Sequence, residues 1–145
     1  MWQESYRAGL MSRKVDQKLY VNYLTKAEES LRIAELALNT KAFDAAVGNA
    51  IHSAINALDC LTVFSLGKRA ASDHGNVLSL LKPILGKDYN DIERQFGALI
   101  EIKNSVEYEP YFASEKDAKL SISRARRILE KVKTKLPRND RTLKT

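Results

Sequence analysis

The sequence predicts an all-α protein, an up-and-down helical bundle of four to five helices. Three observations favour this fold. Apolar residues recur at steps of three and four, glycine and proline are scarce and fall between these periodic segments, and no run alternates long enough to predict a strand. The short connections between the segments favour antiparallel neighbours, and a length of 145 residues fits one domain.

The first two helical segments are long and carry different kinds of apolar residues. The first covers 16–39, and its apolar residues share one face of a 3.6-residue helix: Leu24, Ala27, Leu31, Ala34 and Leu38. The second covers 42–66 and is rich in alanine, so a neighbouring helix can approach it closely. Gly67 follows as the left-handed residue that commonly ends a helix.

The third segment is short, and the fourth is again long. A helix is predicted over 73–85, where apolar residues recur at helical spacing. The next helix has its cap at Asp88 or Asn90 and extends to about Tyr108. It should stop there because Pro110 disfavours helical geometry at the residue before it.

The last helix has the clearest start. Ser114 is followed three residues later by Asp117, a weaker form of the capping box, and Pro137 ends the periodic pattern. The chain therefore divides into an N-terminal extension (1–13), a helical bundle (14–137) and a basic C-terminal tail (138–145).

Positive charge is concentrated near the C-terminal end. The net charge is +6, yet residues 1–114 hold 13 basic and 14 acidic side chains, whereas residues 115–145 hold 11 and 4. Such a cluster attracts polyanions. Three interpretations of this basic cluster stay open: a solvated helix face with a frayed tail, a surface that binds nucleic-acid phosphates, or a surface that binds an acidic protein. The residues predicted for a nucleic-acid surface are Arg124, Arg126, Arg127 and Lys131.

The composition excludes several classes of protein. Cys60 is the only cysteine, which excludes an internal disulfide framework and a multi-cysteine zinc site. The glycines never cluster as a phosphate-binding loop requires, and only His52 and His74 could act as imidazole bases. No metal and no cofactor are expected. No apolar run approaches the ~20 residues of a membrane span, and Glu4 disfavours a secretory signal, so we expect a cytoplasmic protein without membrane contact.

The end of the fourth helix carries the most specific signal. Residues 103–108 read KNSVEY, and earlier come the alanine-rich second helix and the stretch DHGNVLSLL. Over about 16–136 this ordering resembles the HEPN family (higher eukaryotes and prokaryotes nucleotide-binding), which consists of small helical bundles. The family signature is Arg-x4-6-His, in which a polar residue usually follows the arginine.

The resemblance implies an RNA-directed role. In the family that this sequence resembles, the active members are metal-independent endoribonucleases and commonly toxins. Their two active-site sets of arginine and histidine meet at a homodimer interface. Other members occur beside a minimal nucleotidyltransferase, as toxin–antitoxin pairs or as its substrate-binding partner. For this chain the resemblance therefore implies a homodimer, an RNA or nucleotide ligand, and a minimal nucleotidyltransferase as partner protein.

This sequence departs from the signature at both positions. Lys103 keeps the positive charge of the arginine but lacks its bidentate fork, and Tyr108 stands where the histidine is expected. A phenol is a poor base because it ionises only near pH ~10. Residues five apart lie ~140° apart around a helix, so these two do not share a face. The candidate catalytic residues are Lys103, Asn104 and Tyr108, with Glu107 supporting them.

Three functions stay open at this point. The first is a degenerate RNA- or nucleotide-binding groove in a HEPN dimer. The second is a non-catalytic helical dimerisation or protein-interaction module, in which Lys103–Glu107 is a surface ion pair and Asn104–Tyr108 a structural polar pair. The third is an active metal-independent endoribonuclease.

Overall fold

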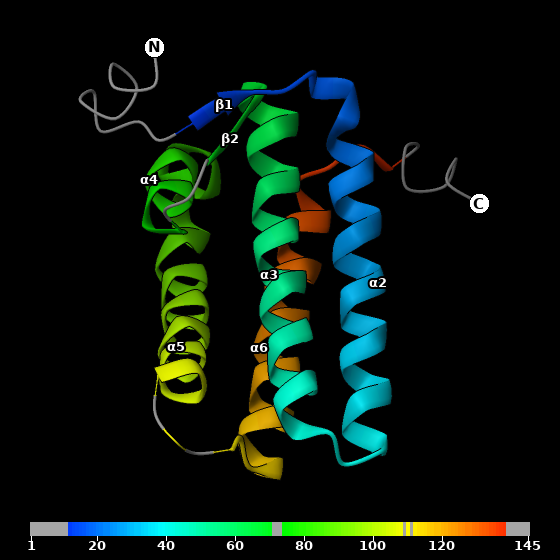
Figure 1. The fold of residues 1–145 in the computed structure, drawn as a ribbon. Helices are drawn as coiled ribbons and strands as arrows, with labels where there is room; N and C mark the ends of the chain where they lie inside the picture. Colours follow the sequence, from blue (N-terminus) through cyan, green and yellow to red (C-terminus); the bar gives the residue numbers. More distant parts are fainter. Residues whose placement is uncertain (1–11, 71–73, 109, 111, 139–145) are drawn as a thin grey trace.

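The structure is a computed structural model that describes residues 12–70, 74–108, 110 and 112–138. Its elements in chain order are the strand β1 (Ser12–Lys14), the 3-10 helix η1 (Gln17–Leu19), α2 (Tyr20–Asn39), α3 (Phe43–Leu66), β2 (Lys68–Ala70), α4 (His74–Leu85), the 3-10 helix η2 (Gly86–Asp88), α5 (Tyr89–Tyr108) and α6 (Glu115–Thr134). Figure 1 shows α3 at the centre, with α2 on one side, α4 and α5 on the other, and α6 behind it. Successive long helices point in opposite directions, so the predicted all-α, up-and-down bundle is confirmed.

Helices α2 and α3 form the tightest pair. The alanines of both helices are fully buried where they meet: Ala27, Ala34, Ala50, Ala54 and Ala57. Ser53 of α3 donates its hydroxyl to the backbone carbonyl of Ala27 in α2 at 2.7 Å. Such a contact requires the two backbones to lie close together, as the small residues predicted. Gly67 ends α3 with φ 63°, in the left-handed conformation that the sequence predicted.

Helix α6 completes the core from behind. Ser114 accepts the backbone N–H of Asp117, whose carboxylate accepts that of Ser114, so the predicted capping box is present. The apolar side chains of α6 are buried: Ala118, Ile122, Ala125, Ile128, Leu129 and Val132. The helix ends at Thr134, before the predicted limit at Pro137, although Leu136 is still only 6% exposed.

The prediction that the chain has no strand is wrong. Strands β1 and β2 pair antiparallel as a two-stranded ribbon, with Arg13 opposite Arg69 and Lys14 opposite Lys68. Each strand has three residues, which is too short for alternation to appear in the sequence, and the pairing joins segments more than 50 residues apart. The first two residues of β1 belong to the predicted 1–13 extension, and they pair with β2.

Several predictions fall on parts of the chain outside this description. Residues 1–11 of the predicted extension, residues 139–145 of the predicted tail and the side chain of His74 are among them. Within the described ranges, none of the helices is both long enough and apolar enough to cross a membrane.

Candidate functional site

The signature segment lies at the end of α5, which is a regular helix through Tyr108. Lys103 donates its ammonium to the carboxylate of Glu107, one turn later, with 2.9 Å between Nζ and Oε2. The lysine side chain is 29% exposed and the glutamate side chain 47%. The surface ion pair considered from the sequence is therefore present, and the charge of Lys103 is partly compensated within its own helix.

Asn104 and Tyr108 lie on another side of the same helix. Both are exposed, and Tyr108 keeps 78% of its surface open to solvent. No hydrogen bond joins their side chains, among the contacts of the described residues, so the polar pair considered from the sequence does not form. Because α5 does not loosen before Tyr108, Lys103 and Tyr108 project ~140° apart, and one chain does not bring them to the same point.

A second exposed aromatic side chain follows the helix. Phe112 is 89% exposed, and the next residue, Ala113, donates its backbone N–H to the Asp44 carboxylate at 2.6 Å. Asp44 belongs to the first turn of α3, so this hydrogen bond holds the connection against the bundle. We call Tyr108 and Phe112 the aromatic end of the bundle.

The outer face of α3 carries small and polar side chains. Ala45 and His52 are exposed, and a Cβ at Gly48 would meet nothing within 4 Å. His52 was predicted to lie at the core edge or in an interface, and its exposure places it on this open face. Cys60, by contrast, is fully buried as a small side chain in the core, as predicted.

Two of the four cations predicted for nucleic-acid contact, Arg124 and Arg126, form side-chain contacts with other helices. Arg126 of α6 forms an ion pair with Glu35 of α2. Arg124 donates from its guanidinium to the side-chain oxygen of Gln95 in α5 at 3.1 Å. Both contacts join α6 to another helix, so they hold these two side chains against the bundle.

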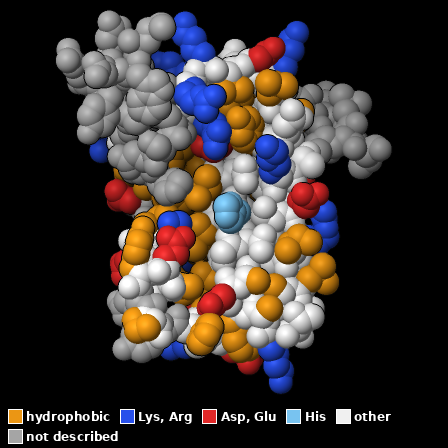
Figure 2. All heavy atoms as spheres, in the orientation of Figure 1, with side chains coloured by type: hydrophobic (Ala, Val, Ile, Leu, Met, Phe, Trp, Pro, Cys, Tyr) orange, Lys and Arg blue, Asp and Glu red, His pale blue; other side chains and the backbone are white. Residues whose placement is uncertain are grey.

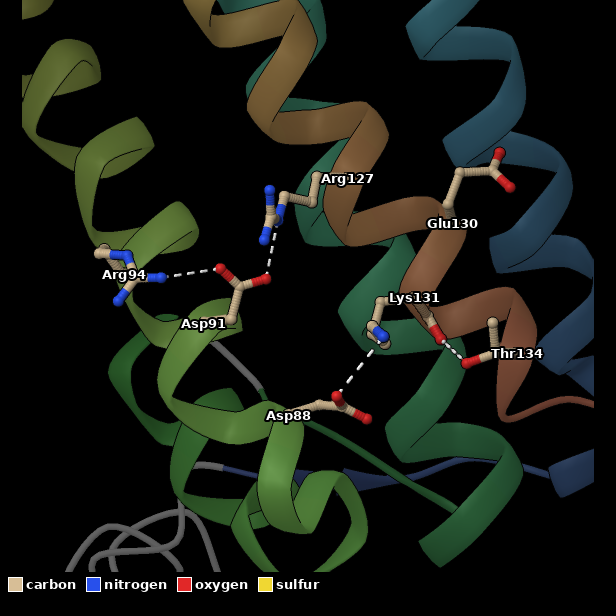
Figure 3. Close-up of a pocket in the computed structure, with 7 residues that line it drawn as sticks. All are labelled: Asp88, Asp91, Arg94, Arg127, Glu130, Lys131 and Thr134. Carbon is tan, nitrogen blue, oxygen red and sulfur yellow. Dashed lines mark hydrogen bonds and ion pairs between the residues drawn. The ribbon is translucent and has the colours of Figure 1, made fainter.

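The other two predicted cations line a hollow of about 490 Å³ between α5 and α6 (Figure 3). Arg127 donates to Asp91 at 2.8 Å, and Lys131 lies 3.4 Å from Asp88. The hydrogen bond from Arg127 lowers the pKa of Asp91, and the one from Lys135 lowers the pKa of Asp88. Both carboxylates are therefore stabilised in the charged form beside the cations.

The charges around this hollow nearly cancel. Its lining contains three carboxylates and three cationic side chains, and Asp91 bridges two of the cations, Arg94 and Arg127. Within the described ranges, no group of three or more His, Cys, Asp or Glu side chains is arranged to hold a metal ion. The hollow is a seam of ion pairs between two helices, with little net charge left for a polyanion.

The comparison with known families agrees with the architecture. Residues 20–135 match the family model of the HEPN domain. The match covers most of the chain, so this protein belongs to the HEPN family of nucleotide- and RNA-associated helical bundles. No curated protein and no solved structure matches the chain.

Sequence reasoning missed two features of the surface. Phe112 was not among the candidate residues, although it follows the signature segment within four positions. The dibasic pairs Arg13–Lys14 and Lys68–Arg69 were also passed over, because nothing in the sequence indicates that they meet in one ribbon.

Proposed function

We propose that this HEPN protein binds single-stranded RNA or nucleotides at the end of α5 without cleaving them. The observation that carries the proposal is the pair of exposed aromatic side chains, Tyr108 at 78% and Phe112 at 89%, in the segment that also holds Lys103 and Asn104. Aromatic side chains stack on unpaired bases, while a lysine and an amide can contact phosphate and base edges.

The geometry of α5 favours binding over cleavage. Ribonucleolytic cleavage requires a base at the ribose 2′-hydroxyl, a cation at the phosphate and an acid at the leaving oxygen. Lys103 is held by Glu107 at 2.9 Å, and Tyr108 projects from another side of the helix. The two side chains of one chain therefore do not share a phosphate, and tyrosine is a weaker base than the histidine of the family signature.

We further propose that the protein acts as a homodimer, with the outer face of α3 at the contact. The small side chains of Ala45 and Gly48 leave room there for a second backbone. As the family resemblance implies, a minimal nucleotidyltransferase is the proposed partner protein, in a toxin–antitoxin pair.

The test of RNA binding uses purified protein with labelled single-stranded and structured RNA in the presence of EDTA. We expect binding without cleavage, and we expect Tyr108→Ala or Phe112→Ala to weaken binding roughly tenfold through loss of base stacking. Leu36→Ala is the matched control, since Leu36 is an apolar side chain of α2 that is 56% exposed. That control should bind RNA as the wild type does.

Other outcomes would assign a different function. Cleavage that Lys103→Ala or Tyr108→Phe abolishes would show an endoribonuclease. Absence of RNA binding together with a co-purifying protein would show an interaction module.

The test of the homodimer is its mass by light scattering, which should be twice that of one chain. The variant Gly48→Arg should have the mass of a single chain, because a large charged side chain would separate the two α3 helices. A single-chain mass for the wild type at micromolar concentration would contradict the homodimer.

A further inference from the structure

The β1–β2 ribbon concentrates positive charge in two short strands. Four of its six residues are cationic, and they pair with like charges across the strands, Arg13 with Arg69 and Lys14 with Lys68. Figure 2 shows Lys and Arg side chains gathered at the end of the molecule where Figure 1 places this ribbon. We call these four side chains the basic ribbon.

One member of the basic ribbon has a compensating carboxylate. Arg69 donates its Nε–H to Asp59 at 3.0 Å, and its guanidinium lies 5.6 Å from the ring centre of Tyr23. Asp59 is only 3% exposed, so this pair anchors the ribbon to the end of α3. Arg69 is therefore a structural member of the ribbon.

Lys14 and Lys68 differ from it, since neither has an ion-pair partner within the ranges that the structure describes. Residues directly opposite in an antiparallel pair have Cβ atoms about 4.5–5.5 Å apart, and like charges at that separation repel each other. A bound anion would relieve this repulsion. The carbonyl end of α3 lies beside the ribbon and favours positive charge, so the fold tolerates the two ammonium groups without an internal acid.

The two lysines border a hollow of about 490 Å³. The only carboxylate in its lining is Asp16, which accepts the backbone N–H of Lys18 at 3.0 Å and so caps η1. Gln17, also in the lining, donates its amide to the carbonyl of Phe64 at 3.0 Å. Both polar neighbours are thus engaged by the backbone, and the ammonium groups are the groups left to meet a ligand.

We propose that the basic ribbon binds the phosphate backbone of RNA, with Lys14 and Lys68 as the contacting residues. This inference rests on RNA being the ligand, as proposed above. The ribbon offers cations but no large apolar side chain that could insert into a membrane, which favours a phosphate backbone over a lipid surface.

The ribbon and the aromatic end lie at opposite ends of α3. The 24 residues of α3 correspond to ~36 Å, about the length of ten stacked nucleotides at ~3.4 Å each. One RNA strand of that length or more reaches from the bases stacked at the aromatic end to the phosphates held by the ribbon. Linking two weak contacts through one ligand raises the overall affinity.

The test measures fluorescence anisotropy with a labelled single-stranded RNA of about 20 nucleotides at several salt concentrations. The variant Lys14→Gln/Lys68→Gln should lose affinity about tenfold or more, and the salt slope should fall by about 1.4, since each phosphate contact contributes ~0.7. The matched control is Lys119→Gln/Lys133→Gln, which also removes two charges, from lysines that pair with Glu115 and Glu28. The control should lose less than about twofold.

A second variant separates RNA binding from a structural role. Lys14→Glu places a carboxylate opposite Lys68, so it should raise the melting temperature while weakening RNA binding more than Lys14→Gln does. If the ribbon had only a structural role, Lys14→Glu would raise the melting temperature of the protein and leave its affinity for RNA unchanged.

Three results would overturn the inference. Equal losses in the ribbon variant and its control would show a general charge effect. Unchanged binding in the ribbon variant, with loss in Tyr108→Ala, would overturn the ribbon and leave the proposed function standing. Absence of RNA binding by the wild type would overturn both, and binding of anionic vesicles in its place would assign the ribbon to a membrane surface.

Discussion

Helix α6 and the basic ribbon are both rich in Lys and Arg, but their surroundings differ. Most cations of α6 meet oxygens from other elements of the bundle, as Arg126 does with Glu35 and Arg127 with Asp91. In the ribbon, Lys14 faces Lys68, and neither has an acidic partner within the described ranges. The comparison teaches that charge counted along a segment is not the charge offered to a ligand, because carboxylates from distant segments can neutralise it.

The carboxylates of the two regions also differ. Asp91, beside α6, has its pKa lowered mainly by the hydrogen bond from Arg127. Asp59, below the ribbon, has its pKa raised because burial penalises the charged form more than Arg69 stabilises it. Ion pairs at the surface of α6 and the buried pair under the ribbon should therefore respond in opposite directions to pH.

The largest expected effect on stability is that of Arg69→Ala. Removing this guanidinium leaves the buried Asp59 carboxylate unpaired, which should cost about 2–4 kcal/mol of unfolding free energy at neutral pH. Without Arg69 the pKa of Asp59 rises further, so the loss should shrink as the pH falls and the carboxyl takes up a proton. Urea unfolding of Arg69→Ala and of the wild type, at neutral and at mildly acidic pH, measures this loss and its dependence on pH. Arg13→Ala, in the opposite strand, should change stability by less than about 0.5 kcal/mol.

The next effect is a gain of RNA binding on α6. Asp88→Asn/Asp91→Asn removes the acidic partners of Lys131, Lys135 and Arg127 without adding a cation. The released cations should raise RNA affinity about fivefold and steepen its salt dependence, measured by the same anisotropy titration. Unchanged affinity would mean that pairing does not hide the charge of α6, and the contrast with the ribbon would fail.

A smaller effect is the loss of stability in acid. Asp91 and Asp88 have lowered pKa values in the folded state, so their stabilisation is present above the ordinary value of 3.8 and is lost as the pH falls below it. Asp59 has the opposite sign, since its contribution declines as the pH rises from 3.8 toward its raised pKa. The free energy of unfolding in urea should change less between neutral pH and acid in Asp91→Asn than in the wild type, by about 1 kcal/mol or less. An unchanged profile would contradict the prediction.

The smallest expected effect is that of Arg126→Gln. Its ion pair with Glu35 joins α6 to α2, and both side chains are nearly half exposed. Water screens such a pair, so its loss should cost roughly 0.5 kcal/mol in urea unfolding and leave RNA affinity unchanged. A much larger loss would show that the pairs of α6 hold the bundle together.

Much of the fold could be predicted because helical signals are local. The 3.6-residue period of Leu24 to Leu38, the left-handed Gly67 and the Ser114–Asp117 capping box each depend on residues within a few positions of one another. The Lys103–Glu107 ion pair could be predicted for the same reason, since a helix brings residues four apart together.

The remaining features depend on contacts between distant residues. Whether Arg127 is free depends on Asp91, 36 positions away in α5, and whether β1 forms depends on β2, more than 50 positions away. By itself, the sequence determined the helices, the caps at Gly67 and Ser114 and the signature segment, because hydrogen bonding and side-chain spacing within a helix are short-range. Only the tertiary structure decided which cations are neutralised and which stay open, because ion pairs form between side chains that the fold brings together.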